Sequence, residues 1–146
     1  MGSLACVMIQ LDIKKIVVSG IAAGFVILVV STLISTATQA LFNYNVMNLA
    51  GMRSVNDPIS ILFFFHPFVV ALGLATLYEF AKKSFTRSAM HNGIVLGLLG
   101  WIVYGIPSAF IVFSSMSYPI GFTVSSVVGS LVYMVCAGIA ITRLSK

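Results

Sequence analysis

The sequence predicts an all-α membrane protein, a bundle of four transmembrane helices with both termini in the cytoplasm. The first supporting observation is composition, because 60% of the 146 residues are hydrophobic and only 8% are charged. A soluble domain has about 25% charged residues, so this chain has too few charges to cover a globular surface in water. No segment has the composition of a separate soluble domain, and we predict that residues 1–146 form a single transmembrane domain.

The second observation is that four segments reach the length of about 20 mainly apolar residues that a membrane helix needs. We predict helices at about 16–42, 58–80, 90–113 and 119–142, and an external loop at 43–57. The second helix should start at Pro58, because Asn56 or Asp57 can cap it and proline suits the first helical position. A short turn separates the third helix from the fourth, so these two should be antiparallel neighbours.

The third observation is the distribution of charge. One side of the predicted bundle has seven basic residues: Lys14, Lys15, Lys82, Lys83, Arg87, Arg143 and Lys146. The other side has only Arg53. The positive-inside rule then places both termini in the cytoplasm and predicts a multi-pass protein of the plasma membrane. The net charge of +5 follows from this topology, so we expect these residues to contact anionic lipid head groups and predict no nucleic-acid partner.

Small residues predict where helices approach one another closely. Glycines at four-residue spacing occur near the start of the first and third helices, as Gly20 with Gly24 and Gly93 with Gly97, and Gly100 follows one turn later. Helices in lipid pack through such small residues, which let two backbones come close. We expect the first and third helices to touch at these glycines.

Each predicted helix also carries polar side chains in its outer half. This polar layer consists of Ser31, Thr32, His66, Tyr104, Ser108, Ser125 and Ser126. His66 lies about 12 Å below the outer surface at about 1.5 Å of rise per residue. Because ionisable groups at membrane depth suggest a function, one hypothesis is an outward-facing cavity for an ion, a quinone head group or a lipid. The alternative is structural: these groups hydrogen-bond to one another or to backbone carbonyls and hold the helices together.

Two prolines interrupt the second and third helices at nearly the same height, Pro67 beside His66 and Pro107 beside Ser108. Proline lacks a backbone donor and clashes with the carbonyl four residues earlier, so we predict a kink at each. Two kinks at one level favour an opening in the polar layer.

The remaining sequence contains few catalytic groups. Glu79 is interpreted as a helix-end ion pair with Lys82 or Lys83, and we expect no carboxylate inside a span, which would exclude a proton relay. Cys6 and Cys136 are far apart and both lie toward the cytoplasm, so neither a thiol pair nor a metal site is predicted. No cofactor is predicted, and the ligands left open are a bound lipid or a quinone.

The segment HNGIVLGLLGWIVYGIPSAF, followed by a short turn and a helix that starts at a proline, resembles a loose group of small prokaryotic four-helix membrane proteins of unknown function. The resemblance covers mainly residues 58–142. It implies a fold without an activity.

Three functions remain open from the sequence. The lack of catalytic groups and the short loops favour a non-catalytic accessory subunit of a larger membrane complex, with other subunits or copies of itself as partners. The second function is an oligomeric transporter or channel for a small solute or ion, which would use the layer around His66 and Tyr104. The third is an enzyme that acts on a lipid or quinone, and we rank it last because we expect no enzymatic activity.

Overall fold

The computed structural model describes residues 11–54 and 56–145, and all of their regular structure is helical. Residues 1–10, 55 and 146 lie outside this description, and with them Cys6 and Lys146. In chain order the elements are α1 (Ile13–Phe42), η1 (Val46–Asn48), η2 (Pro58–Phe64), α2 (His66–Ala81), η3 (Lys82–Ser84), α3 (Ala89–Gly100), η4 (Trp101–Gly105), α4 (Ile106–Ser115) and α5 (Ile120–Leu144).

These elements form four spans that are long and apolar enough to cross a membrane. Span 1 is Ile13–Phe42, span 2 is Pro58–Ser84, span 3 is Ala89–Ser115 and span 4 is Ile120–Leu144. The prediction of an all-helical chain with four such helices is therefore confirmed for the part of the chain that the structure describes.

Side-chain caps decide where the first two spans begin. Asp12 accepts the backbone N–H of Lys15 at 3.1 Å, so α1 starts at Ile13 rather than near residue 16. Asp57 accepts the backbone N–H of Ile59 at 2.9 Å, and η2 starts at Pro58. In both places a carboxylate satisfies one of the N–H groups that a helix start leaves without an intrahelical partner.

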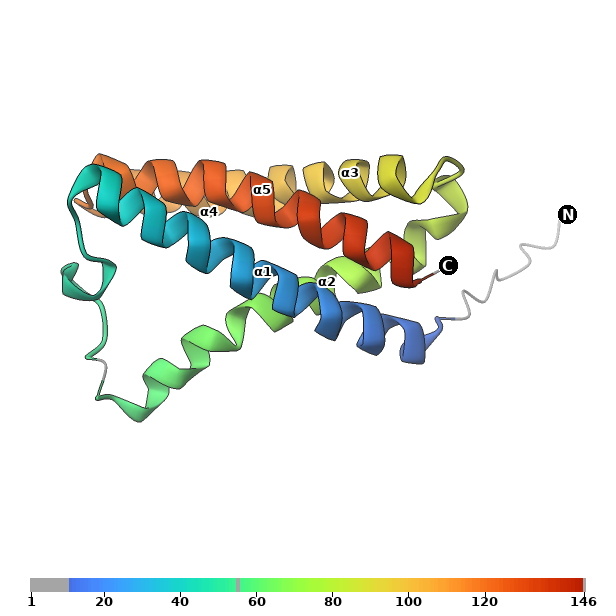
Figure 1. Cartoon of the computed structure of the whole chain (residues 1–146), viewed down its shortest axis with the longest axis horizontal. Coiled ribbons are helices and arrows are strands. Elements are labelled where there is room, and N and C mark those ends of the chain that lie inside the picture. The colour runs from blue at the N-terminus through green and yellow to red at the C-terminus, as the bar shows by residue number, and fades with distance from the viewer. Residues whose placement is uncertain (1–10, 55, 146) are drawn as a thin grey trace, which may run out of the picture.

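The helix α5 packs along both α1 and α3, and α1 also packs along α2. The start of α1, the turn between α2 and α3 and the end of α5 lie at one end of the bundle (Figure 1). We call this end the basic end, because it carries the described cationic residues Lys14, Lys15, Lys82, Lys83, Arg87 and Arg143. The opposite end, which carries residues 43–54, 56 and 57, is the loop end.

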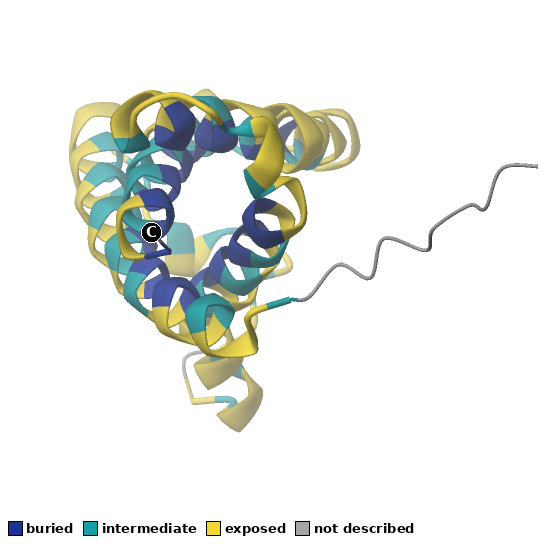
Figure 2. Ribbon diagram, turned by 90° about the vertical axis from the view of Figure 1, so that its right-hand side faces the viewer, coloured by how far each residue is buried: buried dark blue, intermediate teal, exposed yellow. Residues whose placement is uncertain are grey.

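Buried residues face the space between the helices, whereas exposed residues face outward (Figure 2). The buried apolar side chains belong mainly to the half of the bundle near the basic end. The core cluster consists of Ala23, Ile27, Ala71, Leu74, Ala75, Tyr78, Leu96, Met134, Ala137 and Ile141, and Ala109 of α4 is buried apart from it. The exposed exterior is apolar as well, with side chains such as Phe25, Val29 and Phe110 more than half exposed, which suits contact with lipid.

The glycines of α1 pack against α2. A Cβ atom added to Gly20 would lie 2.7 Å from Leu72 Cδ2, and one added to Gly24 would lie 2.5 Å from Phe68 Cδ1. The expectation that these glycines meet the third span is therefore wrong. Glycine spacing marks a close approach of two backbones, but it carries no information about which helix approaches.

The glycines of α3 pack against α5 instead. An added Cβ would lie 2.5 Å from the Cα of Ile139 at Gly93, and 2.5 Å from the Cα of Val135 at Gly97. These neighbours are backbone atoms, so the two helices touch main chain to main chain. Gly100 faces a leucine side chain of α2. The short turn between spans 3 and 4 explains the choice, because it makes α5 the antiparallel neighbour of span 3.

Spans 2 and 3 each change helix type next to a proline. In span 2, η2 winds as a 3-10 helix up to Phe64, and the α-helix begins at His66, directly before Pro67. In span 3, the π-helical turn η4 ends at Gly105, two residues before Pro107. Proline cannot supply the usual backbone donor, and irregular turns of this kind re-satisfy the carbonyls that it leaves unpaired. Figure 1 shows η2, in green, diverging from α4 and α5 toward the loop end.

Candidate functional site: a polar pocket between the four spans

A pocket of about 450 Å³ lies between the four spans in the half of the bundle near the loop end. Its lining includes every member of the polar layer expected from the sequence: Ser31, Thr32, His66, Tyr104, Ser108, Ser125 and Ser126. Pro67 also lines it, whereas Pro107 is not among the lining residues. We call this cavity the polar pocket. The structure thus brings seven side chains from four helices to one place.

The side chains of His66 and Tyr104 meet across the pocket wall. His66 Nε2 lies 2.6 Å from the hydroxyl oxygen of Tyr104, within hydrogen-bonding distance. His66 is the first residue of α2, and Tyr104 belongs to the π-helical turn η4, so both irregular turns position the pair. Neither ring is sealed inside the protein, since Tyr104 is 38% exposed and His66 is also exposed.

The pair leaves one hydrogen-bond donor in either arrangement of its protons. When the Tyr104 hydroxyl donates to Nε2, the Nδ1–H of His66 remains; when Nε2–H donates to Tyr104, the tyrosine O–H remains. Acceptor lone pairs also remain in each case, on the tyrosine oxygen and, when Nε2–H donates, on Nδ1 of His66. A molecule in the pocket can therefore accept one hydrogen bond from this pair and donate another to it.

Several hydroxyl groups of the pocket donate to carbonyls of their own helices. In α1, Ser31 and Thr32 both donate to the carbonyl of Leu28, at 3.2 and 2.7 Å. In α5, Ser126 donates to the carbonyl of Phe122 at 2.9 Å. These three hydroxyl protons therefore serve a structural role, because they bond to backbone carbonyls of their own helix, as is usual for serine and threonine. The oxygen atoms keep acceptor capacity, so the hydroxyls can still accept a hydrogen bond from a bound molecule.

Sequence reasoning missed further lining residues on α5, among them Ser130 and Tyr133. Together with Ser126 they occur at spacings of four and three residues, which place side chains on one face of a helix. This stripe could have been recognised in the sequence. Behind it, Trp101 Nε1 donates to the Ser130 hydroxyl at 3.1 Å, so the single tryptophan of the chain contacts the pocket wall.

A second pocket, of about 930 Å³, lies at the loop end between η2 and the preceding loop. Its walls are mainly apolar, and its rim includes Arg53 and Asp57, which form an ion pair at 2.8 Å. The backbone N–H of Ile59 and the Arg53 guanidinium hold the pKa of Asp57 below its ordinary value. Phe63 and Phe64 line both this pocket and the polar pocket. We call this cavity the outer pocket.

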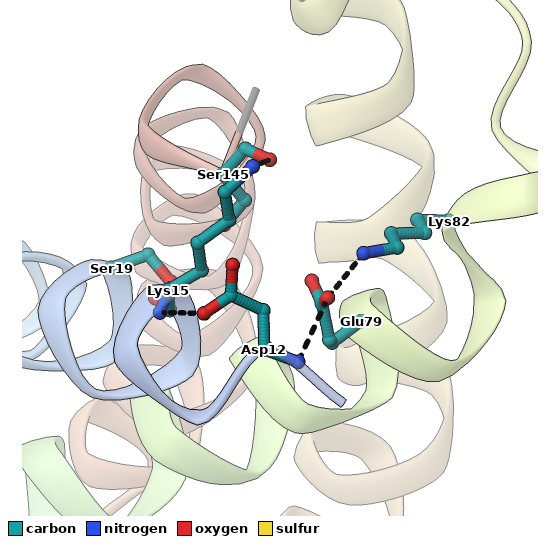
Figure 3. A network of polar contacts seen from close by, with 6 residues as sticks. All are labelled: Asp12, Lys15, Ser19, Glu79, Lys82 and Ser145. Carbon is teal, nitrogen blue, oxygen red and sulfur yellow. Dashed lines mark hydrogen bonds and ion pairs between the residues drawn. The ribbon is translucent and has the colours of Figure 1, made fainter. Parts of the chain in front are cut away.

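A separate polar cluster lies at the basic end (Figure 3). Glu79 of α2 is only 2% exposed. Its Oε1 accepts a hydrogen bond from the Asp12 backbone N–H at 3.3 Å and forms an ion pair with Lys82. Within the described residues, Glu79 Oε2 has no hydrogen-bond partner. The expectation of no carboxylate inside a span is therefore wrong, although the ion pair with Lys82 is present. Its burial depends on the start of α1, which covers it, and helix periodicity cannot reveal that.

The same cluster connects α1 to α5. Lys15 Nζ donates to the carbonyl of Ser145 at 3.4 Å, and the Ser19 hydroxyl donates to the carbonyl of Lys15 at 2.6 Å. Together with the Glu79 contacts, the bond from Lys15 to Ser145 connects α1, α2 and α5 at the basic end. Across residues 11–54 and 56–145, no group of three His, Cys, Asp or Glu side chains is arranged to hold a metal ion.

No family model matches the chain, and no curated protein or solved structure shows a significant similarity to it. The geometry of the polar pocket is therefore the main guide to function.

Proposed function

We propose that this chain is a multi-pass protein of the plasma membrane whose polar pocket binds the polar part of a small molecule. The main support is that polar side chains from all four spans line one pocket in the half of the bundle near the loop end. In this proposal the protein binds and presents a ligand and performs no chemistry on it. Membrane lipids surround it, and its termini lie in the cytoplasm.

The distribution of charge supports this orientation. The described basic residues of spans 1, 2 and 4 lie at the same end of the bundle as the start of α1 and the end of α5, whereas Arg53 is at the loop end. Cytoplasmic segments are enriched in lysine and arginine. The polar pocket would then occupy the outer half of the membrane.

The size and chemistry of the pocket favour binding. Ligand pockets usually have volumes of about 300–1,000 Å³ and combine apolar walls with a few polar groups, and the polar pocket fits this description. Catalysis has less support, because Ser31 and Ser126 give their protons to backbone carbonyls and no carboxylate is among the described lining residues. A serine nucleophile would need a neighbouring base to take its proton, and the histidine that lines the pocket, His66, is hydrogen-bonded to Tyr104 instead of to a serine.

The packing near the basic end argues against a continuous pore through a single chain. Ala71, Ala75 and Ala137 are at most 2% exposed, and they belong to the apolar core between the polar pocket and the basic end. This core closes the pocket toward the basic end, which suits binding from the outer half of the membrane in the proposed orientation.

Native mass spectrometry of the protein, released from its own membranes in mild detergent, tests this proposal. The wild-type protein should carry a bound small molecule of constant mass. Ser108→Phe should remove it, because the larger side chain fills the pocket. Val128→Phe is the matched control, since Val128 of α5 is 51% exposed and does not line the pocket. His66→Ala should lose the molecule while keeping the helical content of the wild type.

Two results would contradict the proposal. One is a wild-type protein that carries no small molecule from its native membrane. The other is a Ser108→Phe variant that folds and retains the same bound mass.

A second candidate function is that of an accessory subunit, and η2 favours it. This segment leads into α2 and packs extensively on no other helix. Ile59, Ile61 and Leu62 are each more than half exposed. Another chain or a second copy could cover this surface. The mass measurement above would show it as additional protein mass; a lone chain would contradict the candidate.

A further inference from the structure

We infer that the ligand of the polar pocket is a neutral lipid with a free hydroxyl group, which reaches the pocket sideways from the outer leaflet along η2. The hydroxyl-bearing head would occupy the polar pocket, and the acyl chains would turn toward the loop end and occupy the outer pocket. The bound molecule would therefore lie inverted relative to the lipids of the outer leaflet. This inference rests on the proposed function, and it adds the class of ligand and its route.

The first supporting observation is that the two pockets are neighbours. Phe63 and Phe64 contribute to the walls of both, so the phenylalanine pair of η2 separates a small polar space from a larger apolar one. The volumes are about 450 and 930 Å³. A molecule with a small polar head and longer apolar chains matches this division, whereas a compact polar solute would use only the smaller space.

The second observation is the exposure of η2. Ile61 and Phe63 are both 60% exposed, and Phe64 is 54% exposed, although all three line a pocket. The divergence of η2 from α4 and α5 leaves this flank of the bundle without helix packing (Figure 1). In a bilayer, the surroundings of such a flank are lipid chains. A molecule already dissolved in the outer leaflet can therefore reach His66 without crossing water.

The third observation is charge. Among the described residues that line the polar pocket, none is Asp, Glu, Lys or Arg. A charged head group would lose its hydration there without gaining a counter-ion, which is costly in a medium of low polarity. Arg53 at the rim of the outer pocket is already paired with Asp57 at 2.8 Å, so a phosphate would have to compete with that carboxylate. A neutral head group is therefore the one that agrees with the uncharged lining of the polar pocket.

The hydrogen-bonding groups select a hydroxyl head. Ser31, Thr32 and Ser126 give their protons to helix carbonyls, so their oxygens can only accept. A hydroxyl donates one hydrogen bond and accepts others, which matches these acceptors and the single remaining donor of the His66–Tyr104 pair. A quinone in its oxidised form has only acceptor oxygens, so it could use the donors of the pocket but none of these three acceptor hydroxyls.

Binding can be measured by the fluorescence of Trp101, the single tryptophan, whose Nε1 donates to Ser130 on the pocket wall. The protein in detergent micelles is titrated with 1,2-dioleoylglycerol, with 1,2-dihexanoylglycerol and with oxidised ubiquinone, each expressed as mole fraction in the micelle. Dioleoylglycerol should bind about tenfold more tightly than dihexanoylglycerol, because its longer chains fill the outer pocket. It should also bind more tightly than ubiquinone.

Two matched variants test the route. Ile61→Asn places a polar group in the outer pocket and should weaken dioleoylglycerol binding about tenfold, with little effect on dihexanoylglycerol. Val128→Asn makes the same kind of change at an exposed site outside both pockets, and its affinities should equal those of the wild type. Ser108→Phe should abolish binding of both glycerides.

The outcomes separate the inference from the proposed function. If neither glyceride nor the quinone binds and the native protein carries no small molecule, the proposed function fails and the inference fails with it. If the two glycerides bind equally and Ile61→Asn has no effect, the polar pocket remains a binding site but the lipid route is wrong. Tighter binding of ubiquinone than of dioleoylglycerol would overturn the assignment of a hydroxyl head.

Discussion

The ion pair between Glu79 and Lys82 joins a buried acid to a partly exposed base. The Glu79 side chain is 1% exposed, whereas the Lys82 side chain is 38% exposed. A carboxylate in this position has lost its hydration and depends on Lys82 and on the Asp12 backbone N–H for compensation. Lys82, in contrast, can turn toward water when its partner is removed. Removing the two partners should therefore have unequal effects.

We predict that Lys82→Met destabilises the protein more than Glu79→Gln. The first change leaves an uncompensated buried charge, which costs about 3–5 kcal/mol. The second keeps an acceptor for the Asp12 N–H and should cost only about 1–2 kcal/mol, because the pair is partly screened at the exposed lysine. Unfolding in a detergent of controlled denaturing strength measures both values.

The double variant is the control for this prediction. Combining Glu79→Gln with Lys82→Met removes the charge together with its partner, so its stability should be close to that of Glu79→Gln alone. Simple additivity of the two losses would show that the residues act independently and would contradict the buried-pair interpretation.

At the scale of helices, two kinds of contact organise the bundle. Near the basic end, glycines allow close packing, as between α3 and α5. Near the loop end, the irregular turns beside Pro67 and Pro107 loosen the packing and leave room for the polar pocket. The helices are thus closely packed in the half near the basic end, and they enclose a pocket in the half near the loop end.

The contact between α3 and α5 yields a prediction with an internal control. Gly97→Leu should lower the free energy of unfolding by about 1–3 kcal/mol or more, because the new Cβ would lie 2.5 Å from the Cα of Val135, a backbone atom that cannot turn aside. Gly73→Leu is the matched change, since a Cβ there meets no atom within 4 Å, and it should have little effect. Thermal unfolding in detergent compares them, and equal stabilities would disprove the close contact.

At the scale of the whole molecule, the proposed orientation predicts which loops are accessible from outside the cell. With Cys6 and Cys136 replaced by serine, Ser54→Cys in the loop should react in intact cells with a maleimide that cannot cross membranes. Ser84→Cys at the basic end should react only after the cells are opened. The reverse pattern would invert the topology and move the polar pocket to the cytoplasmic half.

The polar layer shows how much of the candidate site can be predicted from the sequence. Depth along a helix follows from counting residues, because the rise per residue is constant, and this was enough to predict which side chains share one level. The pairing of His66 with Tyr104 and the exposure of their rings were not predictable. They depend on a π-helical turn in span 3 and on the divergence of η2, which arise from how proline and its neighbours pack in three dimensions.

Composition and periodicity by themselves determined that the described part of this chain is helical and has four apolar spans. The length of an apolar segment and the positions of its charges are local properties, and they decide whether a helix can cross a bilayer. Only the tertiary structure decided which helices touch, that Gly20 faces α2 and Gly97 faces α5, and that Glu79 is buried beneath the start of α1. These facts depend on the rotation and neighbours of each helix. Apolar helix surfaces are nearly interchangeable in sequence, so it is backbone-to-backbone fit that selects the partner.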